Sequence, residues 1–125
     1  MNKTPLAINF SRFQAYRLAP DEVALFEFLL FKQSYYGIGM YFYYSKNKIE
    51  EELKIGRRRL KAIIEMFEEI GILYSVVEQE GTTNNKTTYF KIDFDRLDED
   101  RFLLNILDCK SDFYVEFKKW VKSVK

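Results

Sequence analysis

The residues of this chain that are best suited to chemistry form a basic cluster. The segment from Lys46 to Lys61 carries seven basic and three acidic residues, although the whole chain has a net charge of only +1. Arginine can donate two hydrogen bonds to a guanine edge or a phosphate, and lysine binds phosphate as a point charge. If a helix begins at Arg57, then Arg57, Arg58 and Lys61 lie on its outward side, whereas Arg59 lies nearer its flank. This pattern predicts a surface that contacts phosphates.

Two neighbouring segments add candidates for phosphate contact. They are three lysines that precede the arginines and three residues of a polar turn, namely Lys46, Lys48, Lys54, Asn84, Asn85 and Lys86. The alternative is an ordinary solvated helix, with the arginines paired to the carboxylates at positions 50–52, and a plain surface turn. Glu78 and Glu80 favour that alternative for the turn, because carboxylates repel phosphate.

Catalytic chemistry is not expected. The chain has no histidine and one cysteine, Cys109, so the usual general base and the cysteine–histidine nucleophile pair are missing. No glycine-rich phosphate loop is present. The acidic run from Asp93 to Asp100 lacks the glycine and distal glutamate of a calcium loop and is interpreted as a solvated turn. The sequence therefore predicts no enzyme, no catalytic or metal-binding residue and no cofactor.

Tyrosines gather just before the basic segment. Tyr35, Tyr36, Tyr41 and Tyr43 lie close together in a chain that is 18% aromatic. Such rings can stack on the bases of a single strand, but they more often fill the core of a sheet. A protein partner that binds an aromatic surface is a further possibility.

The first long helix is expected to begin at Pro20 and to run to about Gln33. Proline suits the first turn of a helix, and the acidic pair that follows it suits the positive end of the helix dipole. Apolar residues occupy almost its whole circumference, so it must be buried on more than one side. Cover can come from the N-terminal arm (residues 1–18), from the C-terminal segment or from a partner subunit. The last possibility predicts a homodimer, in which the arm is a candidate for exchange between subunits.

The segments that follow have clear boundary signals. A short strand is expected at 40–44, Ser45 as the N-cap of a helix over 46–53, a turn at 54–56, and a second helix over 57–70 that Gly71 ends. Strands over 72–80 and 87–93 form a hairpin. Asp98 is a candidate cap for a short helix that runs through Leu107, and Ser111 or Asp112 for the last helix.

The segment Phe42–Leu73 resembles the helix-turn-helix core of winged-helix DNA-binding domains. Lys48–Gly56 looks like the first helix and turn, and Arg57-Arg58-Arg59-Leu60 looks like the start of the recognition helix. Phe67–Leu73 is similar to the ending that is common in bacterial and phage winged-helix proteins. Gly56 departs from the family, which often has serine or threonine at this cap. The likeness covers about residues 20–93.

The resemblance implies an α+β fold in one domain, residues 1–125. A winged helix-turn-helix core of three helices and a β-hairpin wing occupies about 20–93, the N-terminal arm precedes it, and C-terminal helices follow over 94–125. It also implies sequence-specific binding of double-stranded DNA through the helix that begins at Arg57, in transcription regulation or in replication initiation of a phage, plasmid or mobile element. The alternative is a winged-helix module that binds proteins and not DNA.

Location follows from what the chain lacks. A single cysteine fits a reducing compartment, the first residues lack the apolar run of a signal peptide, and no apolar stretch is long enough to cross a membrane. We therefore expect a cytoplasmic protein that makes no membrane contact.

Overall fold

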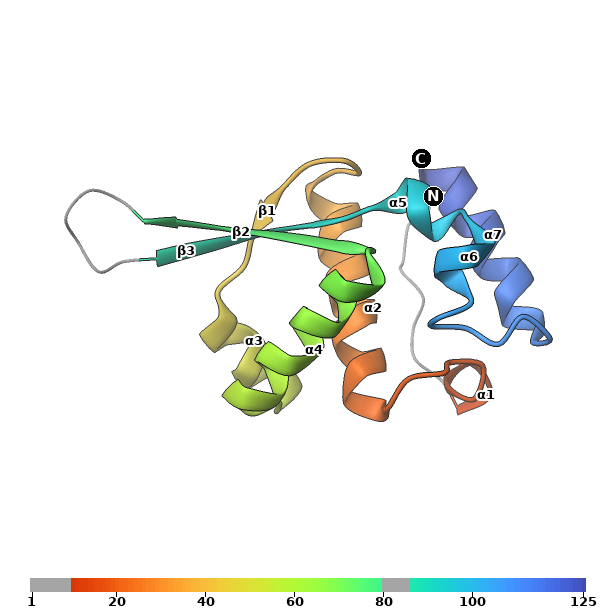
Figure 1. Cartoon of the computed structure of the whole chain (residues 1–125), viewed down its shortest axis with the longest axis horizontal. Helices are drawn as coiled ribbons and strands as arrows, with labels where there is room; N and C mark the ends of the chain where they lie inside the picture. The colour runs from red at the N-terminus through yellow and green to blue at the C-terminus, as the bar shows by residue number, and fades with distance from the viewer. Residues whose placement is uncertain (1–9, 80–85) are drawn as a thin grey trace.

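The chain folds into a mixed α+β structure with a three-stranded antiparallel sheet, seen in a computed structural model that describes residues 10–79 and 86–125 (Figure 1). No helix within these ranges is both long and apolar enough to span a bilayer. In chain order the elements are α1 (Phe10–Phe13), α2 (Pro20–Tyr36), β1 (Phe42–Tyr43), α3 (Lys46–Leu53), α4 (Arg57–Ile70), β2 (Leu73–Gln79), β3 (Lys86–Ile92), α5 (Phe94–Leu97), α6 (Asp100–Leu103) and α7 (Asp112–Val124).

The sheet has the strand order β1-β3-β2, so the first strand pairs with the last. Phe42 pairs with Phe90, and Leu73 pairs with Ile92. All four side chains are buried on the face of the sheet that is turned toward the helices. The predicted hairpin is confirmed. The strand expected at 40–44 is shorter, because only Phe42 and Tyr43 find a partner on β3.

The helix pair α3 and α4 has the predicted boundaries. The Ser45 hydroxyl caps α3 by accepting a hydrogen bond from the backbone N–H of Lys48. Helix α4 buries Leu60, Ile63, Ile64 and Phe67 on one side, as its apolar period predicts. Gly71 ends α4 in the left-handed conformation, at φ 96°, and its N–H donates hydrogen bonds to the carbonyls of Phe67 and Glu68. Local signals thus fix this pair and the turn between its helices.

Helix α2 runs to Tyr36, three residues beyond the predicted end. The buried side chain of Gln33 explains the extension, because its amide donates hydrogen bonds to the carbonyls of Gly37 and Met40, at 2.6 and 2.7 Å. The side-chain oxygen Oε1 of Gln33 accepts a hydrogen bond from the backbone N–H of Ile92, at 2.7 Å. One side chain therefore holds the end of α2, the loop before β1, and strand β3 together.

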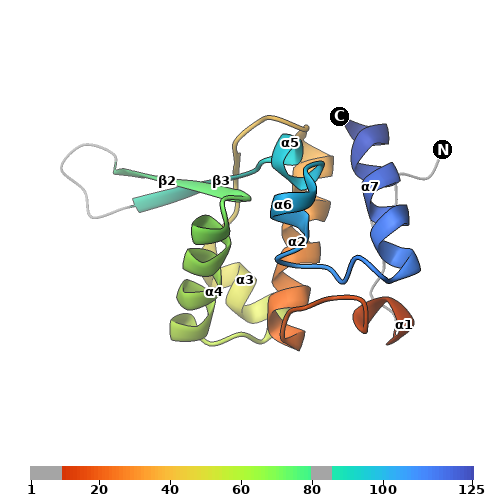
Figure 2. The same ribbon diagram turned by 45° about the vertical axis from the view of Figure 1, so that its right-hand side comes forward.

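Most of the apolar circumference of α2 is covered from within the chain, although Phe31 remains 43% exposed. Phe26 contacts Tyr16 from the N-terminal segment, Phe67 from α4 and Phe117 from α7, with ring centroids 5.8–6.0 Å apart. Figure 2 shows α7 beside α2 at the end of the molecule opposite the hairpin. The N-terminal and C-terminal segments therefore supply the cover, and the apolar character of α2 does not require a second subunit.

The C-terminal region corrects one expectation. Asp98 does not cap a helix that runs through Leu107, because the chain there forms two short helices, α5 and α6. Asp93 caps α5 through the backbone N–H of Arg96, and Asp98 lies at the end of that helix. Of the two candidates for the last cap, Ser111 is the one that accepts a hydrogen bond, from the N–H of Tyr114 at 3.2 Å.

Candidate nucleic-acid interface

The first turns of α4 present an open basic surface. Arg57, Arg58 and Lys61 are all exposed. Arg58 and Lys61 make no hydrogen bond or ion pair through their side chains with any residue in the described ranges. The Nε of Arg57 lies 3.8 Å from a carboxylate oxygen of Glu50, with 83% of the Arg57 side chain in solvent. An exposed pair of this length is weak, so all three cations can reach a ligand.

Arg59 is engaged differently from its neighbours. Its guanidinium donates hydrogen bonds to both carboxylate oxygens of Asp21, at 2.6 and 2.9 Å, and to Glu22, at 2.9 Å. The hydrogen bond to Asp21, followed by that to Glu22, raises the pKa of Arg59, and the Arg59 guanidinium lowers the pKa of Asp21. Of the four predicted cations on α4, Arg59 is therefore the one that joins α4 to the start of α2.

Three further lysines lie on α3 and in the turn that follows it. Lys46 and Lys48 are exposed in the first turn of α3, and Lys54 is exposed in the turn before α4. Lys54 adopts the left-handed conformation, at φ 56°, which turns the chain toward α4. Ile49 is fully buried and anchors α3 beneath this surface. Lys54 therefore adjoins the basic start of α4, whereas Lys46 and Lys48 lie at the opposite end of α3.

The loop end of strand β3 approaches the start of α3. A shallow hollow of about 180 Å³ lies between them and contains both Lys46 and Lys86; its lining is Tyr43, Tyr44, Ser45, Lys46, Asn47, Lys86 and Thr88. The strand order brings these two lysines together, since β1 leads into α3 and pairs with β3. Asn84 and Asn85, the other predicted contacts in the hairpin, lie outside the described residues.

The second half of α4 has the opposite charge. Glu65, Glu68 and Glu69 are exposed there, and Glu68 accepts a hydrogen bond from the Ser75 hydroxyl at 2.6 Å. A phosphate chain is attracted to the first half of the helix and repelled by the second. The exposed charge of α4 thus changes from basic in its first turns to acidic in its second half.

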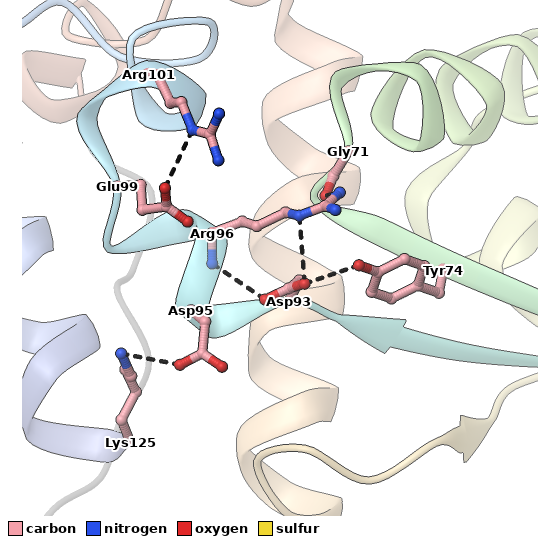
Figure 3. Close-up of polar contacts among 8 residues, drawn as sticks. All are labelled: Gly71, Tyr74, Asp93, Asp95, Arg96, Glu99, Arg101 and Lys125. Carbon is pink, nitrogen blue, oxygen red and sulfur yellow. Dashed lines mark hydrogen bonds and ion pairs between the residues drawn. The ribbon is translucent and has the colours of Figure 1, made fainter.

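The carboxylates of the acidic run from Asp93 to Asp100 form helix caps and ion pairs within the chain. Asp93 caps α5 and accepts a hydrogen bond from Tyr74, which raises the pKa of that phenol (Figure 3). Lys125 pairs with Asp95 at 3.0 Å, and Lys118 pairs with Asp100 at 2.6 Å. Lys118 of α7 and Lys125, which follows that helix, therefore offset part of this acidic charge. No three potential ligand side chains gather to hold a metal within the parts of the chain that the structure describes.

The tyrosines near β1 are at the surface. Tyr35, Tyr36, Tyr41 and Tyr43 are all exposed, whereas Phe42 between them is buried. Three more residues belong to this surface and were not predicted from the sequence: Tyr74, Tyr89 and Lys91. Strict alternation puts Tyr74 on the same side of its strand as Val76 and Lys91 on the same side as Tyr89, and the register of the three strands then places them on the side of Tyr43.

The site thus combines two helices joined by a short turn with exposed cations on α3, on α4 and at the loop end of β3. Searches of protein-family models, of curated proteins and of solved structures find no match to this chain.

Proposed function

We propose that this protein binds double-stranded DNA through the N-terminal turns of α4. The observation that carries the proposal is the exposure of Arg58 and Lys61, whose charged groups have no partner among the described residues. Unpaired, exposed cations on the first turns of a helix can enter a major groove and meet base edges or phosphates. Arg57 adds a third cation that only a weak contact with Glu50 restrains.

The surroundings of α4 support a contact larger than one helix. Lys54 lies next to its start, Lys46 and Lys48 lie in the first turn of α3, and Lys86 lies beside Lys46 at the loop end of β3. Phosphate contacts set the register of a protein on a duplex, and base contacts read the sequence. In the proposed complex the lysines bind phosphates of the DNA backbone, and Arg57 and Arg58 lie nearest the bases. The likeness to winged-helix regulators and initiators favours a role in transcription control or in replication of a phage, plasmid or mobile element.

A cytoplasmic location belongs to the same proposal. Cys109 is the one cysteine of the chain, and its thiol is exposed and free. Free exposed thiols are typical of reducing compartments. DNA binding would take place there.

The test is fluorescence anisotropy with a labelled random duplex of about 25 base pairs, at two salt concentrations. Arg58→Ala/Lys61→Ala should weaken binding and lower the slope of log K against log salt by about 1 for each phosphate that the variant no longer neutralises. Lys110→Ala/Lys119→Ala is the matched control, because it removes the same charge from two exposed lysines elsewhere. Equal weakening in both double variants would show attraction to net charge alone and would contradict the proposed site.

A second candidate function is a protein-interaction module that lacks DNA binding. The exposed tyrosines favour it, as does the use of Arg59 in an ion pair with α2. Such a module would show no salt-dependent affinity for the duplex in the same titration. Binding that weakens steeply with salt would reject it as the sole function.

A further inference from the structure

One face of the sheet is turned away from α3 and α4 (Figures 1 and 2). Side chains alternate along a strand, so directly paired residues share a face. The register Tyr43↔Tyr89↔Val76 places these three residues in one row across the sheet. The neighbouring row, Phe42, Phe90 and Ser75, points to the helices, since Phe42 and Phe90 are buried and Ser75 bonds to Glu68 of α4.

The outward row belongs to an apolar surface that no described helix covers. Tyr43 is 50% exposed, Tyr41 45% and Val76 42%, and the rings of Tyr43 and Tyr89 lie 6.1 Å apart. The tyrosine face consists of Tyr41, Tyr43, Tyr74, Val76 and Tyr89. Contiguous exposed aromatic surface of this kind marks sites of protein association, and the cores of interfaces are rich in tyrosine and poor in charge.

The charges at the two ends of the tyrosine face have opposite signs. Lys91 lies at one end, with its ammonium 4.8 Å from the ring centroid of Tyr41 and 5.3 Å from that of Tyr74. Glu78 is exposed at the other end, on β2. Lys91 is two residues beyond Tyr89, and Glu78 is two residues beyond Val76 in the opposite direction, so the neutral row lies midway between them. Neither forms an ion pair with another described residue.

We propose that the tyrosine face binds the tyrosine face of a second copy of this chain. A two-fold axis that runs across the strands, along the row Tyr43–Tyr89–Val76, stacks the two sheets with their strands antiparallel. It brings the Lys91 end of each protomer over the Glu78 end of its partner. The other in-plane axis, along the strands, would place the Lys91 end over the Lys91 end of the partner and the Glu78 end over its Glu78 end. Charge complementarity therefore selects a second copy in one orientation.

The same charges argue against a nucleic acid on this face. Its cations are Lys91 and Arg96, and its carboxylates are Glu78 and Asp93, of which Asp93 lies 3.6 Å from Arg96. The balance is zero, whereas surfaces that stack single-stranded bases also carry a positive groove for the backbone. The proposed dimer is independent of duplex binding, because Arg58 and Lys61 lie on α4, on the other side of the sheet.

The test is sedimentation equilibrium of the full chain, from low micromolar to near-millimolar concentration. The wild type should show a monomer–dimer equilibrium. Lys91→Glu and Glu78→Lys should each weaken dimerisation by about tenfold or more, because each turns two attractive contacts into repulsive ones. The double swap Lys91→Glu/Glu78→Lys should restore the wild-type constant. Lys61→Glu, a reversal of equal size on α4, should leave the constant unchanged, and circular dichroism confirms that each variant is folded.

Three results would overturn the proposal. One is a wild-type chain that remains monomeric over the whole range, and another is a double swap that stays as weak as either single variant. The third is a monomeric chain that binds a labelled oligothymidine and no longer does so as Tyr43→Ala, because the face would then be a stacking platform. Recovery in the double swap supports the dimer and its orientation together.

Discussion

The guanidinium of Arg59 and the carboxylate of Asp21 meet at 2.6 Å although 38 residues separate them along the chain. This contact joins the first turn of α4 to the first turn of α2, and Glu22 strengthens it from the next position. The surroundings of Arg59 and Arg58 therefore differ, because carboxylates bind the guanidinium of Arg59, whereas Arg58 faces solvent. Neighbouring arginines in one basic run thus have different roles, one in the fold and the other at the proposed interface.

We predict that Arg59→Ala lowers thermal stability, whereas Arg58→Ala leaves it nearly unchanged. The reason is that, of these two arginines, Arg59 is the one that donates hydrogen bonds to Asp21 and Glu22. The pH dependence gives a second measure. Arg59 lowers the pKa of Asp21, so the stability from this pair is present above the ordinary value of 3.8 and is lost as the pH falls through the lowered value. Thermal melts from pH 7 to 2 should show this loss in wild type and a smaller one in Asp21→Asn.

We predict that Glu27→Ala lowers the free energy of unfolding by about 3 kcal/mol. Glu27 is buried and accepts hydrogen bonds from Arg12, at 3.0 and 3.1 Å, and from the Tyr16 hydroxyl, at 2.6 Å. Its removal leaves the buried guanidinium without this carboxylate. Urea denaturation measures the change, and Val115→Ala, an exposed truncation on α7, should shift the midpoint little. A change below about 1 kcal/mol in Glu27→Ala would show that Arg12 finds another partner.

We predict that Gln33→Ala lowers the free energy of unfolding by about 2–4 kcal/mol. The change removes three hydrogen bonds, to Gly37, Met40 and Ile92. The backbone N–H of Ile92 is then left buried without its partner. The loop before β1 should also loosen, which amide hydrogen exchange at Met40 and Tyr41 would report. Unchanged exchange there would show that β1 pairing alone holds the loop.

We predict that Gly71→Ala lowers the free energy of unfolding by about 1–2 kcal/mol. The residue has φ 96°, and an added Cβ would lie 2.8 Å from Nη1 of Arg96 and 3.2 Å from the Phe102 ring. Backbone strain at this φ and displacement of the two neighbouring side chains both destabilise the variant. Chemical denaturation measures the decrease, and wild-type stability in this variant would contradict the left-handed end of α4.

We predict that Gly56→Ser raises the free energy of unfolding by about 0.5–1 kcal/mol. Gly56 caps α4 without a side-chain hydrogen bond, its φ is −68°, and no atom lies within 4 Å of an added Cβ. Serine fits this conformation and can accept a bond from the first turn of the helix. A small rise in melting temperature is the expected readout, and a fall would show that the position needs glycine.

Much of the fold could be predicted because its signals are local. The cap at Ser45, the apolar period of α4 and the stop at Gly71 predicted both helices of the pair with their observed bounds. The errors occur where distant residues intervene. Gln33 extends α2 through its bond to β3, and β1 is short because pairing with β3 limits it.

The sequence by itself determined the positions of the basic helix, its outward side and its acidic second half, since charge and helical period are properties of a continuous segment. Only the tertiary structure decided which arginine is free, because the carboxylates of Asp21 and Glu22 reach Arg59 from another helix. It also decided that Lys46 and Lys86 share one hollow and that Tyr43 faces solvent. Those facts depend on strand order and register, which couple residues far apart in the chain and which no local pattern encodes.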